Sequence, residues 1–256
     1  TYEVLKGYDA ALHPHTEDFA NSLVQIESFL ERADLVFIKP RAGNRGNRIF
    51  VLKRAQGSFS LKYYETGRQQ LFSPLTLEAA LGVVAVAAGE KPYIIQQGIE
   101  SLRYEGAVFD VRVVMVHDGQ SWHSILESRL APPGSDLSNV FQGGSVQATE
   151  DLLSSMFGEE VARETEAEIR HVSHGMAAHF ESLYPNDLME IGFDFVLDSG
   201  RKLHLVEVNS KPGVAGFGSE TKIFEWKPED QPWYEKWVYP HVRHLAAFLR
   251  SKAERG

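Results

Sequence analysis

Residues 189–213, Met-Glu-Ile-Gly-Phe-Asp-Phe-Val-Leu-Asp-Ser-Gly-Arg-Lys-Leu-His-Leu-Val-Glu-Val-Asn-Ser-Lys-Pro-Gly, decide the fold of this chain. Two apolar runs within them, Ile191–Leu197 and Leu203–Val208, flank a turn at 198–201. Short runs rich in valine, phenylalanine and leucine on either side of Asp-Ser-Gly-Arg are typical of two strands and their connection. The stretch therefore predicts a β-hairpin, around which the rest of the chain is arranged.

Three polar residues interrupt the apolar runs of this hairpin: Asp194, Glu207 and Asn209. Glu207 and Asn209 are two residues apart, so on a strand they point to the same side. If the loop is even-numbered and pairs Asp198 with Leu203, Asp194 lies opposite Glu207 on that side. Like charges opposite each other destabilise a sheet, so a cation is expected between them. Clustered hard oxygens suit Mg²⁺, although an exposed face with scattered charges has the same spacing.

The composition excludes several classes of function. A length of 256 residues allows one large domain or two small ones with ample core. The net charge of −9, with no basic block, argues against a nucleic-acid backbone or an anionic membrane as the main partner. The absence of cysteine excludes thiol catalysis, Cys-ligated zinc and disulfides. The apolar stretch 79–89 is too short to span a bilayer and no secretory signal opens the chain, so a cytoplasmic location is expected.

The periodicity of apolar residues predicts mixed secondary structure. Helices are expected from Thr16 to Leu30, with Thr16 as the N-cap, over 76–88 and over 150–183. Strands are expected over 33–39, 48–53, 60–64, 91–99, 108–117 and 121–131, and a long loop over 132–149. Helices interspersed with antiparallel hairpins favour an α+β fold with two lobes over a doubly wound parallel sheet.

Residues 38–49 combine Lys39 at a strand end with a loop that contains Gly43 and Gly46. Glycines let a backbone approach an anion, and successive N–H groups can cradle a phosphate. The loop is neither a Walker A motif nor a dinucleotide fingerprint, because no Gly-Lys-Ser/Thr follows and a strand comes next. Taken alone, it is also typical of a plain hairpin turn, and the second glycine-containing loop at 139–145 has the same ambiguity.

These features occur in one order along the chain: Lys39 and its loop, Gln96–Ile99, Asp110–Arg112, the second glycine loop, and the Asp194 hairpin. In this combination the chain resembles the ATP-grasp superfamily, and in particular its YheC/YheD-like, endospore-coat-associated branch, from about residue 1 to 215. The motifs that carry the resemblance are Ile38-Lys39-Pro40 with its loop, Tyr104-Glu105-Gly106 through Phe109–Val113, Ala131 to Gly144, and Glu207-Val208-Asn209-Ser210-Lys211-Pro212-Gly213.

The resemblance implies an α+β ATP-grasp fold in which ATP binds between two lobes. Residues 1–95 would form the N-terminal lobe, and residues 96–256 the C-terminal lobe with the metal-binding hairpin. Family members usually carry a further domain upstream, and a lysine at the place where Thr1 stands. We therefore expect either that this chain is a fragment or processed form, or that its substrate site is built differently.

The resemblance also implies roles for individual residues. Lys39 would hold the α- and β-phosphates under the glycine loop, and Gln96 to Ile99 would line the adenine pocket. The residues implied for ATP are Lys39, Gly43, Gly46, Gln96, Gln97, Ile99, Asp110, Asn139, Gly143 and Gly144. Those implied for catalysis are Arg112, Arg129 and Lys211. Those implied for two Mg²⁺ ions, with Mn²⁺ as an alternative, are Asp194, Glu207 and Asn209.

The activity that the resemblance implies is an ATP-dependent carboxylate–amine ligase that forms an amide or peptide bond through an acylphosphate. Its partners would be small-molecule or peptide carboxylates and amines. Two alternatives stay open: a phosphotransferase on the same scaffold, and a non-catalytic nucleotide-binding or spore-coat-associated protein. In the ligase and in the phosphotransferase, the main task of the protein would be to neutralise charge on the transferring phosphoryl group.

Overall fold

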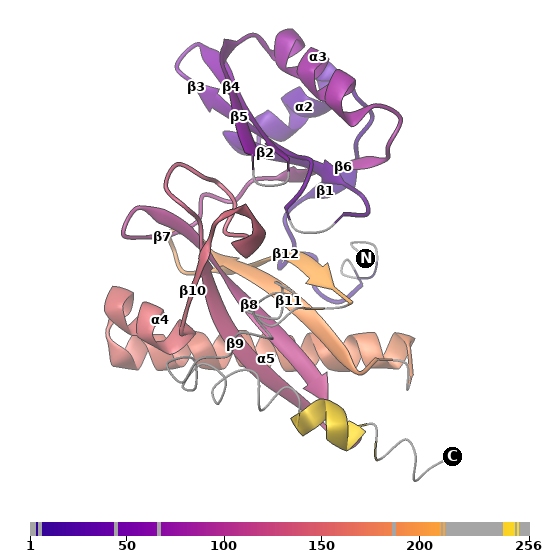
Figure 1. Ribbon diagram of the computed structural model, residues 1–256, viewed down its shortest axis with the longest axis vertical. Coiled ribbons are helices and arrows are strands. Elements are labelled where there is room, and N and C mark those ends of the chain that lie inside the picture. Colours follow the sequence, from indigo (N-terminus) through magenta and orange to yellow (C-terminus); the bar gives the residue numbers. More distant parts are fainter. Residues whose placement is uncertain are drawn as a thin grey trace.

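The computed structural model describes residues 4, 7–43, 46–65, 68–185, 188–210, 212, 243–248 and 250. Figure 1 shows two lobes, each built on one antiparallel sheet with helices packed against it. This mixture of helices and antiparallel sheets confirms the expected α+β class. Within the described ranges, no helix combines the length and the apolar character needed to cross a bilayer.

The N-terminal lobe contains a six-stranded sheet in the order β1-β6-β2-β3-β4-β5. Its strands are β1 (Thr16–Asp18), β2 (Leu35–Pro40), β3 (Ile49–Ala55), β4 (Ser58–Glu65), β5 (Arg68–Leu75) and β6 (Tyr93–Gln97). Helices α2 (Leu23–Leu30) and α3 (Leu77–Ala88) pack their apolar residues against this sheet. Thr76 caps α3: its hydroxyl oxygen accepts from the N–H of Ala79 at 3.2 Å.

The C-terminal lobe contains a second sheet in the order β10-β9-β8-β11-β12, with β7 paired to β8. Its strands are β7 (Arg103–Tyr104), β8 (Ala107–His117), β9 (Trp122–Leu130), β10 (Ser145–Gln147), β11 (Glu190–Leu197) and β12 (Leu203–Asn209). Helices α4 (Thr149–Phe157) and α5 (Glu159–Leu183) pack on one face around a core that includes Phe193 and Phe195. The helical residues 243–248 contribute Leu245 to a smaller cluster with Val114 and Val116.

One local expectation was wrong, one strand was missed, and one expected helical stretch is divided in two. Residues 16–18 form strand β1 and not the first helical turn, because Thr16 pairs with Gln96 of β6 and the left-handed Asn21 (φ 52°) separates this strand from α2. Residues 68–75, which carried no strand prediction, pair with β4. The predicted single helix 150–183 is broken at Gly158, whose φ of 83° suits glycine.

The segment before β1 packs on the C-terminal lobe. Leu12 is buried in the core of the second sheet, and its carbonyl oxygen accepts from the N–H of Leu205 at 2.9 Å. Strand β6, by contrast, runs across residues 95 and 96 and belongs to the first sheet. The predicted boundary between the lobes at residues 95 and 96 stays a prediction.

Candidate functional site

The β11–β12 hairpin pairs the two predicted acidic residues with each other, although its loop register differs from the predicted one. Asp194 lies opposite Glu207. The expected pair of Asp198 with Leu203 does not occur, because Leu203 pairs with Leu197 instead. A register shift between Asp194 and Phe195 restores the alignment by leaving Val206 as an extra residue in β12. This is a β-bulge.

The bulge exchanges the two faces of the end of β12. Before it, Leu203 and Leu205 are buried in the core. After it, Val208 packs against that core, while Glu207 and Asn209 line a cavity. A regular strand would have placed Glu207 and Asn209 on the same side as Leu203 and Leu205, since side chains alternate. The bulge is therefore what presents these two polar side chains at the surface of the site.

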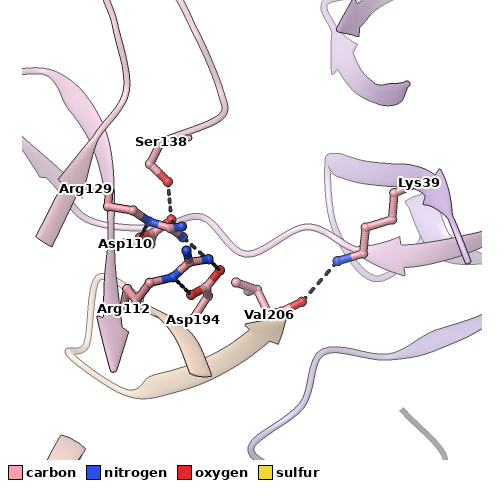
Figure 2. Close-up of polar contacts among 7 residues, drawn as sticks. All are labelled: Lys39, Asp110, Arg112, Arg129, Ser138, Asp194 and Val206. Atoms are coloured by element: carbon pink, nitrogen blue, oxygen red, sulfur yellow. Dashed lines mark hydrogen bonds and ion pairs between the residues drawn. The ribbon is translucent and has the colours of Figure 1, made fainter. Parts of the chain in front are cut away.

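Lys39 reaches this surface from the other lobe. Its ammonium donates to the backbone carbonyl of the bulge residue Val206 at 3.0 Å (Figure 2). It also donates to Oε1 of Gln96 at 2.8 Å. Gln96 is buried and donates in turn to the hydroxyl of Thr16 at 3.0 Å. Lys39, at the end of β2, is thus held over the β11–β12 hairpin by one contact from each lobe.

A cavity of about 440 Å³ lies between the lobes at this point, within the range typical of small-molecule sites. Its lining includes residues of the first glycine loop, the end of β6 and the end of β12. The predicted site residues among them are Lys39, Gly43, Gly46, Gln96, Glu207 and Asn209. The structure therefore brings four of the predicted nucleotide-binding residues and two of the three predicted metal ligands, Glu207 and Asn209, to one cavity, while Asp194 is buried and is not among its lining residues.

Four charged side chains form a buried network beside the cavity (Figure 2). Arg112 donates from Nε and Nη2 to both oxygens of Asp194, each at 2.8 Å. Arg129 donates in the same way to both oxygens of Asp110, each at 2.7 Å, and lies 2.8 Å from Asp194. The hydroxyl of Ser138 also donates to Asp110. The guanidinium groups of Arg112 and Arg129 thus hold the carboxylate of Asp194, which lies opposite Glu207.

The electrostatics separate the two facing carboxylates. Burial favours the neutral form of Asp194, but Arg112 and Arg129 outweigh it and hold the pKa of that carboxyl well below its ordinary value. Burial and then the charge of Asp194 raise the pKa of Glu207, although its side chain opens to the cavity. Burial also lowers the pKa of Lys39, against the pull of Glu207 and Asp194. A divalent cation at Glu207 would relieve the repulsion between the two acids.

The amide of Asn209 shows how these residues fit a metal ion. With its nitrogen toward Glu207, the amide donates to Oε1 at 3.0 Å and its oxygen accepts from Arg112 at 3.1 Å. In the opposite orientation its oxygen faces the Glu207 carboxylate. The first orientation satisfies the amide without an ion, whereas a cation between the two side chains would favour the second, because carboxylate and amide oxygens are a donor set suited to Mg²⁺. The side chains present therefore fit a magnesium ion.

The two glycine-containing loops meet across the cavity. The side-chain amide of Gln142 donates to the carbonyl oxygen of Gly46 at 3.2 Å. A Cβ on Gly46 would lie 3.3 Å from the Cβ of Asn139, and Gly46 has a φ of 66°. A Cβ on Gly144 would lie 2.6 Å from the carbonyl oxygen of Leu130, so the loop can approach β9 only with glycine there. Both loops are thus built for close backbone contact.

A second contact joins the lobes at the rim of these loops. The ammonium of Lys62 on β4 lies 2.7 Å from Oδ2 of Asp136 and donates to the carbonyl oxygen of Gly134. The hydroxyl of Tyr64 accepts from the N–H of Asp136 at 2.9 Å. Burial raises the pKa of Tyr64 to about 12, so this hydroxyl stays protonated at neutral pH.

The remaining predicted residues have other positions. The N–H of Gln97 donates to the carbonyl oxygen of His15 at 2.8 Å, and neither Gln97 nor Ile99 is among the described residues that line the cavity. Gly143, with a φ of 90°, turns the loop beside Gly144. Lys211 lies outside the described residues.

Sequence reasoning missed three parts of this site: Ser138, Glu127 and the bulge at Val206. Glu127 is buried and lies directly opposite Arg112, just as Arg129 lies opposite Asp110. Opposite charges at matching positions of two strands carry a signal, because such pairs stabilise one register over another. The register of the β8–β9 hairpin could have been chosen on that basis. The bulge left no comparable pattern in the sequence.

Two known proteins resemble this chain, one in sequence and one in fold. The chain is 26% identical over 188 residues to the endospore coat-associated protein YheD of Bacillus subtilis (strain 168), which covers 71% of this chain and 40% of that protein. The chain thus spans less than half the length of this relative. The solved structure of the D-cycloserine synthetase DcsG matches with a TM-score of 0.56 and 15% identity, over 99% of this chain and 68% of that one, which shows a shared fold.

A family model described as YheC/D-like ATP-grasp matches residues 1–227, most of the chain. Both the expected family and the expected ATP-grasp fold are confirmed by these findings. The chain belongs to the YheC/D-like ATP-grasp family.

Proposed function

We propose that this chain binds ATP with Mg²⁺ and acts as a carboxylate–amine ligase that proceeds through an acylphosphate. The observation that carries the proposal is the shared cavity. Lys39 enters it from one lobe, and Glu207 and Asn209 enter it from the other. A cation for phosphate oxygens and a donor set for magnesium are the two parts that phosphoryl transfer from ATP requires.

In this proposal Lys39 and the backbone of Gly43 and Gly46 hold the phosphates of ATP. Asp194, Glu207 and Asn209 hold two Mg²⁺ ions, with Mn²⁺ as an alternative. The ions, when bound, would neutralise charge on the phosphates during transfer. Gln96 and the segment that follows it line the adenine side.

Arg112 and Arg129 act from the network below the metal site. Their guanidinium groups already bind Asp194 and Asp110 in a bidentate manner. They orient Asp194 toward the phosphates and supply positive charge that needs no reorganisation during transfer. Lys211 is proposed, on family resemblance, to contact the acyl acceptor.

The reaction would take two steps. An oxygen of the substrate carboxylate attacks the γ-phosphorus of ATP, the bond to the β-phosphate oxygen breaks, and ADP leaves. The lone pair of a neutral amine then attacks the acyl carbon, the bond to the phosphate oxygen breaks to release inorganic phosphate, and the nitrogen loses a proton to that phosphate or to water. The loops of Gly46 and Asn139, which meet over the cavity, would keep water from the acylphosphate between these steps.

Trapping with hydroxylamine tests the proposal. The chain is supplied with Mg²⁺, ATP and a panel of carboxylates and peptides, and the hydroxamate, ADP and phosphate are measured. We expect hydroxamate with the cognate carboxylate, and loss of it in Glu207→Gln and Lys39→Met. Lys53→Met, which removes an exposed lysine from β3 of the same lobe, is the matched control and should keep activity.

Two results would reject the ligase. Phosphate appearing on a hydroxyl or nitrogen acceptor without hydroxamate would identify a phosphotransferase. ATP binding without turnover of any carboxylate in the panel would identify a non-catalytic nucleotide-binding protein. Unchanged ATP turnover in Glu207→Gln would reject the metal assignment separately.

A further inference from the structure

A second group of possible metal ligands lies at the end of the C-terminal lobe away from the first lobe (Figure 1). It consists of Asp118 in the β8–β9 turn, His123 on β9, and His244 in the helical residues 243–248. One ligand atom from each residue lies within 4.8 Å of those of the other two. His244 is more than a hundred residues from Asp118 and His123 in the sequence, so the fold and not local spacing brings it to that pair.

The turn holds the carboxylate of Asp118 in place. Its Oδ1 accepts from the N–H groups of Gln120 and Ser121, each at 2.9 Å. Its Oδ2 points to Nε2 of His123 at 2.7 Å. A ligand that is fixed by backbone N–H groups before metal binding loses little conformational freedom when the ion arrives.

Packing independently fixes the position of His244. Leu245 packs against the cluster that includes Val114, and the ring of Phe248 lies edge-on to that of His117 at 5.7 Å between centroids. The ring of His244 stacks on that of His123, with centroids 3.8 Å apart and planes at 12°. The C-terminal helical residues thus present an imidazole directly to the Asp118–His123 pair.

We propose that Asp118, His123 and His244 form a binding site for a zinc-class divalent ion. Two imidazole nitrogens and one carboxylate oxygen are a zinc donor set, unlike the all-oxygen set at Asp194, Glu207 and Asn209. A small rearrangement is required. In tetrahedral geometry the nitrogen and oxygen ligands would be about 3.4 Å apart, and the two rings must rotate out of their stack so that both lone pairs point to the ion.

A cavity of about 540 Å³ borders the proposed ion and would leave its fourth coordination position open to water. His123 and His244 line this cavity together with His174, Glu166 and Arg170. The guanidinium of Arg170 is held by the carbonyl oxygen and hydroxyl of Ser124. The ion would fasten the C-terminal helical residues to the β8–β9 hairpin.

Zinc binding by the full chain tests this site, with saturating Mg²⁺ present and in a Glu207→Gln background so that the nucleotide cavity does not contribute. We expect one Zn²⁺ per chain by equilibrium dialysis, and the intense visible absorption of tetrahedral Co²⁺ when cobalt is substituted. His123→Gln and His244→Gln should each weaken zinc binding by more than about 100-fold, since loss of a direct ligand exceeds loss of an outer-shell partner.

The matched control is His171→Gln, which removes an exposed histidine of α5 that is outside the proposed ligand set and should leave zinc binding unchanged. Circular dichroism of each variant shows whether it has folded, and Asp118→Asn, which keeps the size of the side chain, repeats the test without a histidine change. The proposal is overturned if the wild-type chain binds no zinc, or if the folded ligand variants bind it as the wild type does.

Discussion

Replacement of Arg129 by methionine should lower the free energy of unfolding far more than an ordinary surface substitution does. Arg129 is 5% exposed, and its guanidinium bridges Asp110 at 2.7 Å and Asp194 at 2.8 Å. Removing one partner of a buried pair leaves a charge without compensation, at a cost of about 3–5 kcal/mol. For a chain of this size, that loss corresponds to a fall in Tm of about 6–20 °C.

Arg41→Met provides a matched control within the same chain. Arg41 also pairs with an aspartate, Asp18, at 2.9 Å, but the two side chains are 52% and 58% exposed. Water screens such a pair, and its removal should cost at most about 1 kcal/mol. Both variants lose one guanidinium and gain one thioether, so the difference between them isolates the effect of burial.

The loss in Arg129→Met should also depend on pH. Burial already raises the pKa of Asp110 even with Arg129 beside it. Without that cation, the folded state holds a proton that the unfolded state releases, so the stability of the variant falls as pH rises through the raised pKa. The deficit relative to the wild type should therefore be smaller near about pH 4.5 than near about pH 8.

Urea unfolding followed by circular dichroism at both pH values measures these quantities. The reasoning requires a large deficit for Arg129→Met, a small one for Arg41→Met, and a deficit of the first that shrinks in acid. Equal losses in the two variants would show that burial of the pair does not determine its energetic role. A deficit independent of pH would show that the unpaired carboxylate is not its cause.

Three further outcomes follow from the packing and the lobe contacts. Gly144→Ala places a Cβ 2.6 Å from a backbone carbonyl oxygen, so we expect a stability loss of about 1–3 kcal/mol and weaker ATP binding in calorimetry. Gly82→Ala, in the middle of α3 with no atom within 4 Å of the new Cβ, should instead raise the unfolding free energy by about 0.5–1 kcal/mol. A stable Gly144→Ala or a destabilised Gly82→Ala would contradict this account. Lys62→Met removes the contact with Asp136 across the lobes and should weaken ATP binding by up to about fivefold, or about 1 kcal/mol, whereas Lys53→Met should not; equal titration curves for the two would show that this contact does not hold the lobes together.

Much of the hairpin site could be predicted from the sequence because it rests on local pattern. The apolar runs and the turn between them indicated two paired strands, and the two-residue spacing of Glu207 and Asn209 indicated one face. The opposition of Asp194 and Glu207 was expected from a loop that pairs Asp198 with Leu203; the opposition is confirmed, but it arises from the bulge at Val206 and not from that loop. The strand-end Lys39 was also identified, and it lies in the same cavity as Glu207.

The parts that could not be predicted depend on contacts between distant residues. Thr16, Glu17 and Asp18 have the composition of a helix start, but pairing with β6 overrides that preference. The position of His244 depends on packing against a hairpin more than a hundred residues earlier. Local propensity contains none of this information.

The extra residue at Val206 makes the end of β12 unusually sensitive to chain length. Deleting Val206 would leave every other side chain unchanged, yet it would exchange the two faces of β12 beyond that point. Val208 would then point away from the core, and Glu207 and Asn209, the two proposed ion ligands, would point into it. In β12 the number of residues matters more than the residue type at position 206. Substitutions should therefore accumulate at position 206 far more readily than insertions or deletions.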